Sequence, residues 1–206
     1  MKKLITLCLC LLCSMSIFGQ EAYLGFGPNQ TEYLYTNTQG ESYEGLKGEG
    51  GIHLEGGYYL KTGYDNLKLA FSLTFDQFNA TGGDELNSYS WESGYMGLQG
   101  GVRFGIIEGV RGSDFALFAN GGVTAKKLLT GVQKINGQTF ELSEEAEFNG
   151  LFKGIYFGLE TRFNITQEVA LGLGYAHSIN YGRTINEETL NFSSGAIVFK
   201  ILTAFY

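Results

Sequence analysis

The chain has 206 residues, a length that fits one domain. Its 31 glycines and single proline argue against long helices, disorder and a collagen repeat, because glycine costs about 0.5–1 kcal/mol relative to alanine inside a helix. The formal net charge of −7 argues against nucleic acid as a partner, since phosphate binding needs clustered Lys and Arg. The composition therefore indicates one domain built from strands.

The first 20 residues predict a secretory signal peptide, because two lysines precede an apolar run from Leu4 to Leu12. We expect cleavage near Gly19 or Gln20, which leaves residues 21–206 as the mature domain. All three cysteines lie before that point, so we expect no disulfide or thiolate site in the mature chain. Lipidation is the alternative, but each cysteine follows a leucine where a small residue is needed. The mature chain has no apolar run long enough for a membrane-spanning helix.

Alternation of apolar and polar residues with a period of two recurs eight times along residues 21–206. In the clearest example, Leu69 and Phe71 belong to one face of a strand, while Lys68 and Ser72 belong to the other. We expect strands near residues 22–35, 48–61, 67–79, 93–107, 115–128, 151–164, 169–182 and 194–206. Each segment is bounded by turn residues, so the pattern predicts an antiparallel meander.

The connections between these segments alternate in length. Short turns such as TGYDN and ITQE alternate with long segments such as NTQGESYEGLK and TINEETLNFS. A transmembrane barrel has this rhythm because one end needs only tight turns, while the other projects loops into the outside medium. The longest connection runs from Lys126 or Lys127 to Gly150, and we expect it to be mobile and solvated. Within it, Gln138 to Leu142 carry an alternative strand pattern that would add a hairpin above the membrane.

The composition of the two faces indicates which one points outward. The apolar phase holds Leu, Ile, Val and Phe, as contact with acyl chains requires, and the other phase holds small polar residues with isolated charges of both signs. We expect those charges to pair inside the barrel, because an unpaired buried charge costs several kcal/mol. The predicted lumen network is Glu55, Lys68, Asp76, Arg103, Lys126, Glu160, Arg162 and Lys200. A soluble lipocalin-like barrel, with its apolar face inside around a ligand, is the alternative.

Aromatic residues near the strand ends are candidates for interfacial girdles: Tyr23, Phe26, Tyr58, Phe104, Phe115, Phe163 and Phe205. In the last segment, Ile197, Phe199 and Ile201 alternate toward the aromatic pair that closes the chain. This ending resembles the aromatic carboxy-terminal signature of Gram-negative outer-membrane barrels, although the apolar phase ends on Phe205 and the final residue is Tyr206.

With the signal peptide and the eight segments, the chain resembles the small outer-membrane β-barrel family that includes the transmembrane domain of outer membrane protein A. The resemblance covers nearly all of residues 21–206. It implies an all-β fold, a closed eight-stranded antiparallel up-and-down transmembrane β-barrel, in the outer membrane of a Gram-negative bacterium.

Eight strands enclose only enough space for side chains, so we expect no open pore. The function predicted is structural or one of surface interaction, without an enzyme activity, a cofactor or a metal. The expected partners are outer-membrane lipid, lipopolysaccharide and an extracellular partner that contacts the loops, with the protein as a monomer. The four long connections, residues 37–50, 80–92, 127–150 and 183–192, carry twelve acidic and four basic residues. The densest acidic cluster, and our candidate surface for partner contact, is Glu141, Glu144, Glu145 and Glu147.

A lipid-modifying hydrolase similar to the lipid A deacylases is the alternative function. His177 and Ser178, with Glu187 or Glu188 downstream, supply the side chains of a base, a nucleophile and an orienting carboxylate. Adjacent residues of a strand point to opposite faces, however, which separates His177 from Ser178. The only other histidine, His53, is predicted on the polar face near Glu55, and two histidines on different strands do not indicate a metal site.

Overall fold

The structure is a computed structural model that describes residues 21–36, 39–40, 47–83, 88–108, 114–145, 147–182, 184 and 189–205. The predicted signal peptide lies outside these ranges. The described part forms one 3-10 turn, Leu142–Glu144, and nine strands: β1 (Glu21–Thr36), β2 (Lys47–Lys61), β3 (Leu67–Gly83), β4 (Ser88–Glu108), β5 (Phe115–Ile135), β6 (Gln138–Glu141), β7 (Leu151–Asn164), β8 (Val169–Tyr181) and β9 (Thr189–Ala204). No helix in this part is long and apolar enough to cross a membrane.

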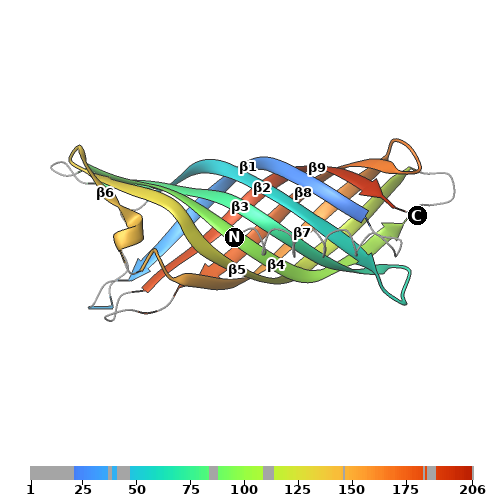
Figure 1. Cartoon of the computed structure of the whole chain (residues 1–206), viewed down its shortest axis with the longest axis horizontal. Coiled ribbons are helices and arrows are strands. Elements are labelled where there is room, and N and C mark those ends of the chain that lie inside the picture. The colour runs from blue at the N-terminus through green and yellow to red at the C-terminus, as the bar shows by residue number, and fades with distance from the viewer. Residues whose placement is uncertain are drawn as a thin grey trace, which may run out of the picture.

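Eight of the strands form a closed ring (Figure 1). Each pairs antiparallel with its neighbour in the chain, and β1 closes the ring by pairing with β9 from Glu21↔Ala204 to Thr36↔Thr189. The remaining strand, β6, is short, lies outside the ring and pairs with the end of β5. The expected eight-stranded antiparallel barrel is therefore confirmed, and the start of β1 lies beside the end of β9.

The two ends of the barrel differ, as the connection lengths predict. The β2–β3 and β7–β8 turns lie at the right of Figure 1, where β1 begins and β9 ends; we call this the short-turn end. The β5–β6 hairpin lies at the left, at what we call the long-loop end. Much of residues 37–46 and 183–188, which were expected as long loops, lies outside the described residues.

Several strands are longer than their alternation predicts. β4 begins at Ser88 where residue 93 was expected, β5 continues to Ile135 beyond residue 128, and β9 begins at Thr189 where residue 194 was expected. All three extensions are at the long-loop end. Spanning a bilayer takes about 9–11 residues per strand, so strands of 21 residues such as β4 and β5 project beyond it.

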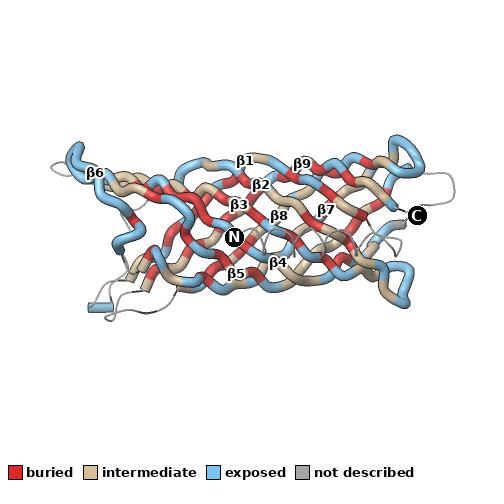
Figure 2. The backbone as a smooth tube through the Cα atoms, viewed as in Figure 1, coloured by how far each residue is buried: buried red, intermediate tan, exposed pale blue. Residues whose placement is uncertain are grey.

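The apolar phase faces outward along the middle of the barrel. Leu159 has 54% of its surface exposed, whereas its neighbour Glu160 has 1%. The same alternation runs along β9, where Ile197, Phe199 and Ile201 are about half exposed. A water-soluble barrel would place these side chains inside, so the lipocalin-like alternative is wrong. Figure 2 shows the resulting alternation of buried and exposed positions along each strand.

Toward the long-loop end, the character of the two phases reverses within the same strands. On β9, Phe192 and Leu190 face inward and are at most 1% exposed, while Asn191 between them is polar. On β3, Phe78 is fully buried although it shares its phase with Asp76. An apolar interior under a polar exterior is the arrangement of a protein surrounded by water. This reversal marks where the barrel leaves the lipid band and continues as a water-exposed extension.

One predicted girdle residue lies elsewhere. Tyr23 is 6% exposed and stacks on Tyr59 inside the barrel, with ring centroids 4.5 Å apart. In this part of β1 the odd-numbered residues point inward, so Tyr23 lies on the inward phase, whereas Leu24 and Phe26 point outward. The other girdle candidates on the outward phase, including Phe163, are partly or substantially exposed. An aromatic residue near a strand end is therefore interfacial only when it also belongs to the outward phase.

Candidate functional site

The middle of the lumen holds a three-residue cluster contributed by β2, β3 and β5. Lys126 Nζ donates to Asp76 Oδ2 at 2.6 Å, and His53 Nδ1 lies 2.6 Å from Asp76 Oδ1. The Asp76 and Lys126 side chains are at most 2% exposed. Each carboxylate oxygen of Asp76 thus has a nitrogen partner, which a carboxylate needs when it is removed from water.

A second cluster lies nearer the short-turn end and centres on Lys200 of β9. Lys200 Nζ lies 2.8 Å from Glu55 Oε1 and 2.9 Å from Glu160 Oε2. Tyr59 donates its hydroxyl to Glu160 Oε2 at 3.1 Å. Arg103 contacts Glu160 Oε1 and has its guanidinium between the rings of Tyr59 and Phe118, 4.2 and 3.6 Å from their centroids. His53 Nε2, 4.0 Å from Glu55 Oε2, connects the two clusters.

Glu21, at the start of β1, contacts Arg103 and two further cations at the short-turn end. Lys68 Nζ lies 3.1 Å from Glu21 Oε2, Arg103 Nη1 lies 3.3 Å from the same oxygen, and Arg162 contacts Glu21 Oε1. Glu21 was absent from the predicted network because it adjoins the expected cleavage site. Its inward phase, shared with Tyr23, was the signal that would have identified it.

The structure therefore brings all eight residues predicted for the lumen into one chain of contacts, together with Glu21, His53 and Tyr59, which the prediction left out. Among the described residues, four carboxylates face five basic side chains in this chain. The least buried cations are Lys68 and Arg162, with 14% and 13% of their side chains exposed. The unmatched positive charge can therefore be hydrated at the short-turn end.

Little open volume remains around the Lys200 and Asp76 clusters, whereas a pocket of about 320 Å³ borders Lys68 and Arg162 at the short-turn end. One cavity of about 40 Å³ is bordered by Glu55, Tyr59 and Lys200, and another of about 20 Å³ is bordered by His53, Asp76 and Ser178. A buried water needs roughly 10–15 Å³, so these cavities have room for a few waters and for no larger molecule. Within the described residues, no group of three His, Cys, Asp or Glu side chains is arranged to hold a metal ion.

A buried aromatic core lies above the ion pairs, inside the barrel at the long-loop end. Phe192 is its centre, with ring centroids 4.5 Å from Phe78, 4.9 Å from Phe152 and 5.5 Å from Tyr95. Trp91 and Tyr33 extend it toward the end of the barrel, 5.3 Å apart. Sequence reasoning expected a polar lumen along the whole barrel and missed this core. Apolar residues on the otherwise polar phase, such as Phe78 and Phe152, were the available signal.

The segment expected to be a mobile, solvated loop is largely structured. β5 and β6 form a hairpin whose turn is Asn136-Gly137, with φ angles of 50° and 83°. Such left-handed pairs match the twist of a two-residue hairpin turn. The chain then folds back over the aromatic core and buries Leu142 completely and Phe148 to within 2%. Residues 134–141 and 143–145 are exposed, as expected of a solvated segment, and the alternative hairpin pattern is confirmed. The expectation of a loop without regular structure was wrong because this segment also carries the apolar residues that cover the end of the core.

A bulge in β5 allows the segment after β6 to fold over the aromatic core. Pairing with β4 shifts between Gly94↔Thr130 and Tyr95↔Leu128, so Leu129 is an extra residue and points outward, 55% exposed. The shift turns Gly131 to the inner face. A Cβ at Gly131 would lie 3.0 Å from Leu142 Cδ1, so the absence of a side chain there lets Leu142 approach β5. The acidic residues of the segment point away from this contact, with Glu141, Glu144 and Glu145 exposed and Glu147 partly exposed.

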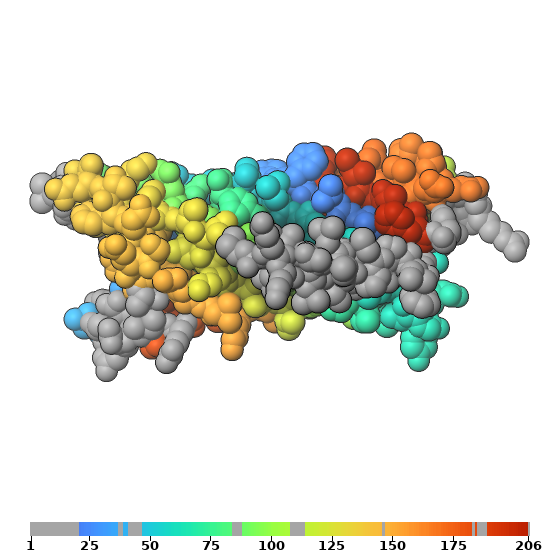
Figure 3. Space-filling view, in the orientation of Figure 1, coloured from blue at the N-terminus to red at the C-terminus, as the bar shows by residue number. Residues whose placement is uncertain are grey.

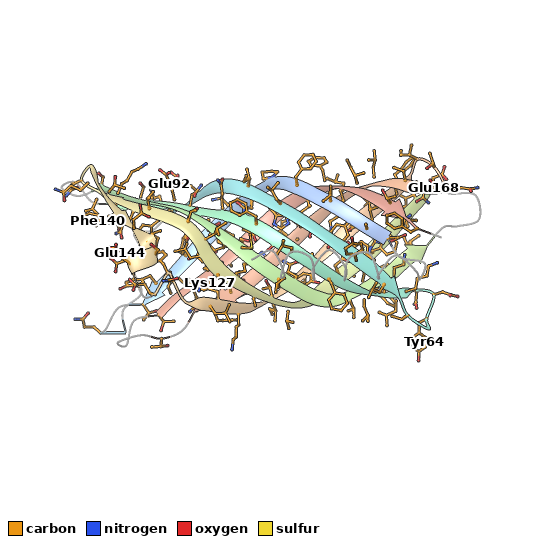
Figure 4. The ribbon with its side chains drawn as sticks, viewed as in Figure 1. Tyr64, Glu92, Lys127, Phe140, Glu144 and Glu168 are labelled. Atoms are coloured by element: carbon orange, nitrogen blue, oxygen red, sulfur yellow. The ribbon has the colours of Figure 1, made fainter. Side chains whose placement is uncertain are left out.

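Figure 4 shows where these side chains lie on the molecule. Glu144, Phe140 and Glu92 project at the long-loop end, opposite Tyr64 and Glu168 at the short-turn end. Glu92 pairs with Lys134 across the outer face of the β4–β5 extension, 2.5 Å from carboxylate to ammonium. The long-loop end thus has an apolar interior and a charged exterior.

The residues proposed for a hydrolase do not converge. Ser178 is buried inside the barrel, where its Oγ lies 3.3 Å from Ser194 Oγ. His177 lies on the other face of β8, with its ring 5.2 Å from that of the outward-facing Phe157. Glu187 and Glu188 lie outside the described residues. The buried His53–Asp76 pair is also near Ser178, but the cavity that they share has space for water only.

The sequence from residue 5 to residue 199 matches the model of the outer membrane protein beta-barrel domain family. The chain belongs to this family. It is an outer-membrane β-barrel protein of the Gram-negative type, as the resemblance implied. No curated protein matches the sequence.

The solved structures similar to this chain include outer-membrane barrels with low sequence identity. Ail, the attachment invasion locus protein of Yersinia pestis, solved in complex with the heparin analogue sucrose octasulfate, shares 12% identity over 89% of this chain and 99% of its own, with a TM-score of 0.40. Neisserial surface protein A shares 12% identity over 88% and 96%, with a TM-score of 0.43. The N-terminal barrel domain of OprF from Pseudomonas aeruginosa shares 9% identity over 89% and 98%, with a TM-score of 0.41.

Proposed function

We propose that this outer-membrane barrel is a surface-interaction protein: the barrel anchors it in lipid, its lumen is closed, and its acidic long-loop end contacts ligands outside the cell. The observation that carries the proposal is the packing of the barrel interior. Ion pairs fill the membrane-spanning part, and the aromatic core centred on Phe192 closes the long-loop end. With no path for solutes, the charged end is the part available for recognition.

The electrostatics of the long-loop end supports this role. Glu141, Glu144 and Glu145 are exposed there, and the four long connections together have a net charge of −8. Such a surface attracts basic groups directly and binds lipopolysaccharide phosphates only through bridging divalent cations. The outward Leu and Phe side chains of the barrel contact outer-membrane lipid. Because β1 and β9 close the ring, the barrel needs no second copy to cover a sheet edge, and we propose a monomer.

The proposal requires the long-loop end to face outward, and cysteine labelling on intact cells tests this. We expect Gly137→Cys, in the β5–β6 turn, to react with a membrane-impermeant maleimide. Tyr64→Cys, in the β2–β3 turn, is the matched control and should react only after the outer membrane is permeabilised. Labelling of Tyr64→Cys alone on intact cells would reverse the orientation and overturn the proposal.

Conductance measurement tests the closed lumen. The protein reconstituted in planar bilayers should give no steady ohmic current, because the cavities around the Lys200 and Asp76 clusters have volumes of only about 40 and 20 Å³. Folding of the same sample is checked by its shift in gel mobility on boiling. A stable current from folded protein would show a pore and contradict the proposal.

A further inference from the structure

The long-loop end contains a pocket of about 490 Å³ that is separate from the lumen ion pairs. Pockets of about 300–1,000 Å³ are the usual size for small ligands. This pocket, here called the acidic aromatic pocket, is lined by Tyr35, Tyr89, Trp91, Phe148, Glu145 and Glu147, together with Gln133 and Ile135. These residues come from β1, β4, β5 and the segment that follows the 3-10 turn.

Strand register and the β5 bulge produce this pocket. Tyr89 pairs with Ile135 and Trp91 with Gln133, so all four share the inner face of the β4–β5 extension beyond the bulge. Packing of Leu142 on Gly131 then returns the chain across this face. Phe148 meets Trp91 edge to face, with ring centroids 4.9 Å apart, and Glu145 and Glu147 precede it. Figure 3 shows the yellow and orange residues of this region forming the left end of the visible face.

The chemistry of the pocket suits a positively charged organic group. Aromatic faces attract ammonium and guanidinium groups, and carboxylates add a charge of opposite sign. Glu145 is exposed and Glu147 partly exposed, and neither side chain has a hydrogen-bond or ion-pair partner among the described residues. A hard metal ion would need six or more oxygen ligands, which these aromatic walls do not supply. An anionic group would be repelled.

Two observations favour a peptide over a free amine. Further exposed carboxylates, Glu141 and Glu144, stand on the same segment outside the pocket, so a ligand with several positive charges gains more than one with a single charge. The indole Nε1 of Trp91, which is 8% exposed, has no hydrogen-bond partner among the described residues. A backbone carbonyl of a peptide would supply the acceptor that this donor lacks.

We propose that the acidic aromatic pocket binds a lysine side chain of a basic extracellular peptide, with the ammonium group between the aromatic walls and the carboxylates of Glu145 and Glu147. The inference rests on the proposed surface-interaction function and names the ligand class of that surface. The remaining carboxylates of the long-loop end attract the neighbouring positive charges of the same peptide.

The chain offers a direct reporter, because Trp91 is its only tryptophan and lines the pocket. The full protein, refolded in detergent micelles, is titrated with acetylated and amidated tetralysine while the tryptophan emission is recorded. We expect a saturable change in emission that weakens with salt. Tetraglutamate should cause none, and spermidine should bind more weakly than tetralysine.

Matched double variants distinguish the pocket from the general negative charge. Glu145→Gln/Glu147→Gln should raise the Kd for tetralysine about fivefold, as expected from the loss of two partly exposed ion pairs. Glu141→Gln/Glu144→Gln removes the same charge from the same segment outside the pocket and should raise the Kd by less than twofold. All four positions are partly or fully exposed, so both variants are expected to fold, which heat-dependent gel mobility checks.

The outcomes separate this inference from the proposed function. If tetralysine binds but both double variants weaken it equally, the acidic surface acts without the pocket, and the inference is overturned while the surface-interaction function stands. Equal affinity for spermidine and tetralysine would overturn the assignment to a peptide. If tetralysine causes no saturable change although labelling places the long-loop end outside, the inference alone fails; if labelling places that end inside, the proposed function fails as well.

Discussion

Lys126 reaches Asp76 across the inner face of an intervening strand, with Nζ 2.6 Å from Oδ2. The two residues lie on β5 and β3, and β4 separates them. The contact depends on Gly97 of β4, where a Cβ would lie 2.9 Å from Lys126 Cγ and 2.7 Å from Thr74 Oγ1. The absence of a side chain at this position lets the lysine cross the strand, so a glycine helps to hold the ion pair together.

Removal of the Lys126 ammonium group should destabilise the barrel strongly. In Lys126→Met, Asp76 keeps only its contact with His53, and the loss of one partner of a buried ion pair costs about 3–5 kcal/mol. The measurement is the free energy of unfolding from a guanidinium titration in lipid vesicles. The double variant Asp76→Leu/Lys126→Met removes both charges and should recover a substantial part of the loss. Equal destabilisation in both proteins would show that packing, not charge, dominates at this place.

A side chain at Gly97 should have a similar effect without a change of charge. We expect Gly97→Val to lower the free energy of unfolding by about 1–3 kcal/mol, because the added methyl groups displace Lys126. The control is Gly100→Val on the same strand, where the nearest atom to an added Cβ is 3.8 Å away on Phe71. Equal stability of the two variants would contradict the role assigned to Gly97.

Two adjacent residues of β7 should be sensitive to opposite changes in polarity: an apolar side chain at Glu160 and a charged side chain at Leu159 should each lower the free energy of unfolding. Glu160→Leu leaves Arg103 with Glu21 and Lys200 with Glu55 as remaining partners, so we expect a loss of roughly 3 kcal/mol, the lower end of the cost of breaking a buried pair. Leu159→Arg places a charge in lipid and should cost about 2–4 kcal/mol. Unfolding titrations in vesicles measure both. A neutral effect of Leu159→Arg would show that position 159 is outside the lipid band.

Truncation of Leu142 should loosen the aromatic core at the long-loop end without affecting membrane insertion. Leu142→Ala removes a fully buried side chain, for which the cost is typically about 2–5 kcal/mol. We expect the emission of Trp91 to shift to longer wavelength at lower denaturant concentration than in the unchanged protein. Leu129→Ala, at an outward position that is 55% exposed, serves as the control. Identical emission curves for the two variants would contradict the burial of Trp91 beneath this segment.

Processing of the exported chain is a further prediction. The intact mass of protein purified from outer membranes should correspond to a chain that begins close to residue 20, and it should not react with thiol reagents, because all the cysteines precede that point. Retention of residues 1–20 would contradict the signal peptide, and a mass increase from acyl chains would support the lipoprotein alternative.

The alternation of residue types was sufficient to predict the ring of strands and the face of each strand that meets lipid. Each strand of a barrel has one face toward lipid and one toward the lumen, so a period of two along the chain records both environments. Leu159 and Glu160 fall on the predicted sides, as do Asp76, Lys126 and Arg103. Tyr23 was assigned to the girdle because its aromatic side chain was weighed more than its phase. Glu21 was omitted because its position next to the expected cleavage site was weighed more than its phase.

The long-loop end was decided by tertiary structure. Period-two alternation does not tell lipid from water, so the apolar residues on the inward phase were not recognised as a core beyond the lipid band, where Phe78, Phe192 and Trp91 pack together. Which cation meets which carboxylate was also undetermined, because the partners come from strands that are not neighbours, as Lys126 and Asp76 do. The sequence alone determined which face of each strand meets lipid, since that depends on each residue's own polarity. Only the folded ring decided which inward side chains touch, because those contacts depend on strand register, on the bulge at Leu129 and on the space left by residues such as Gly97 and Gly131.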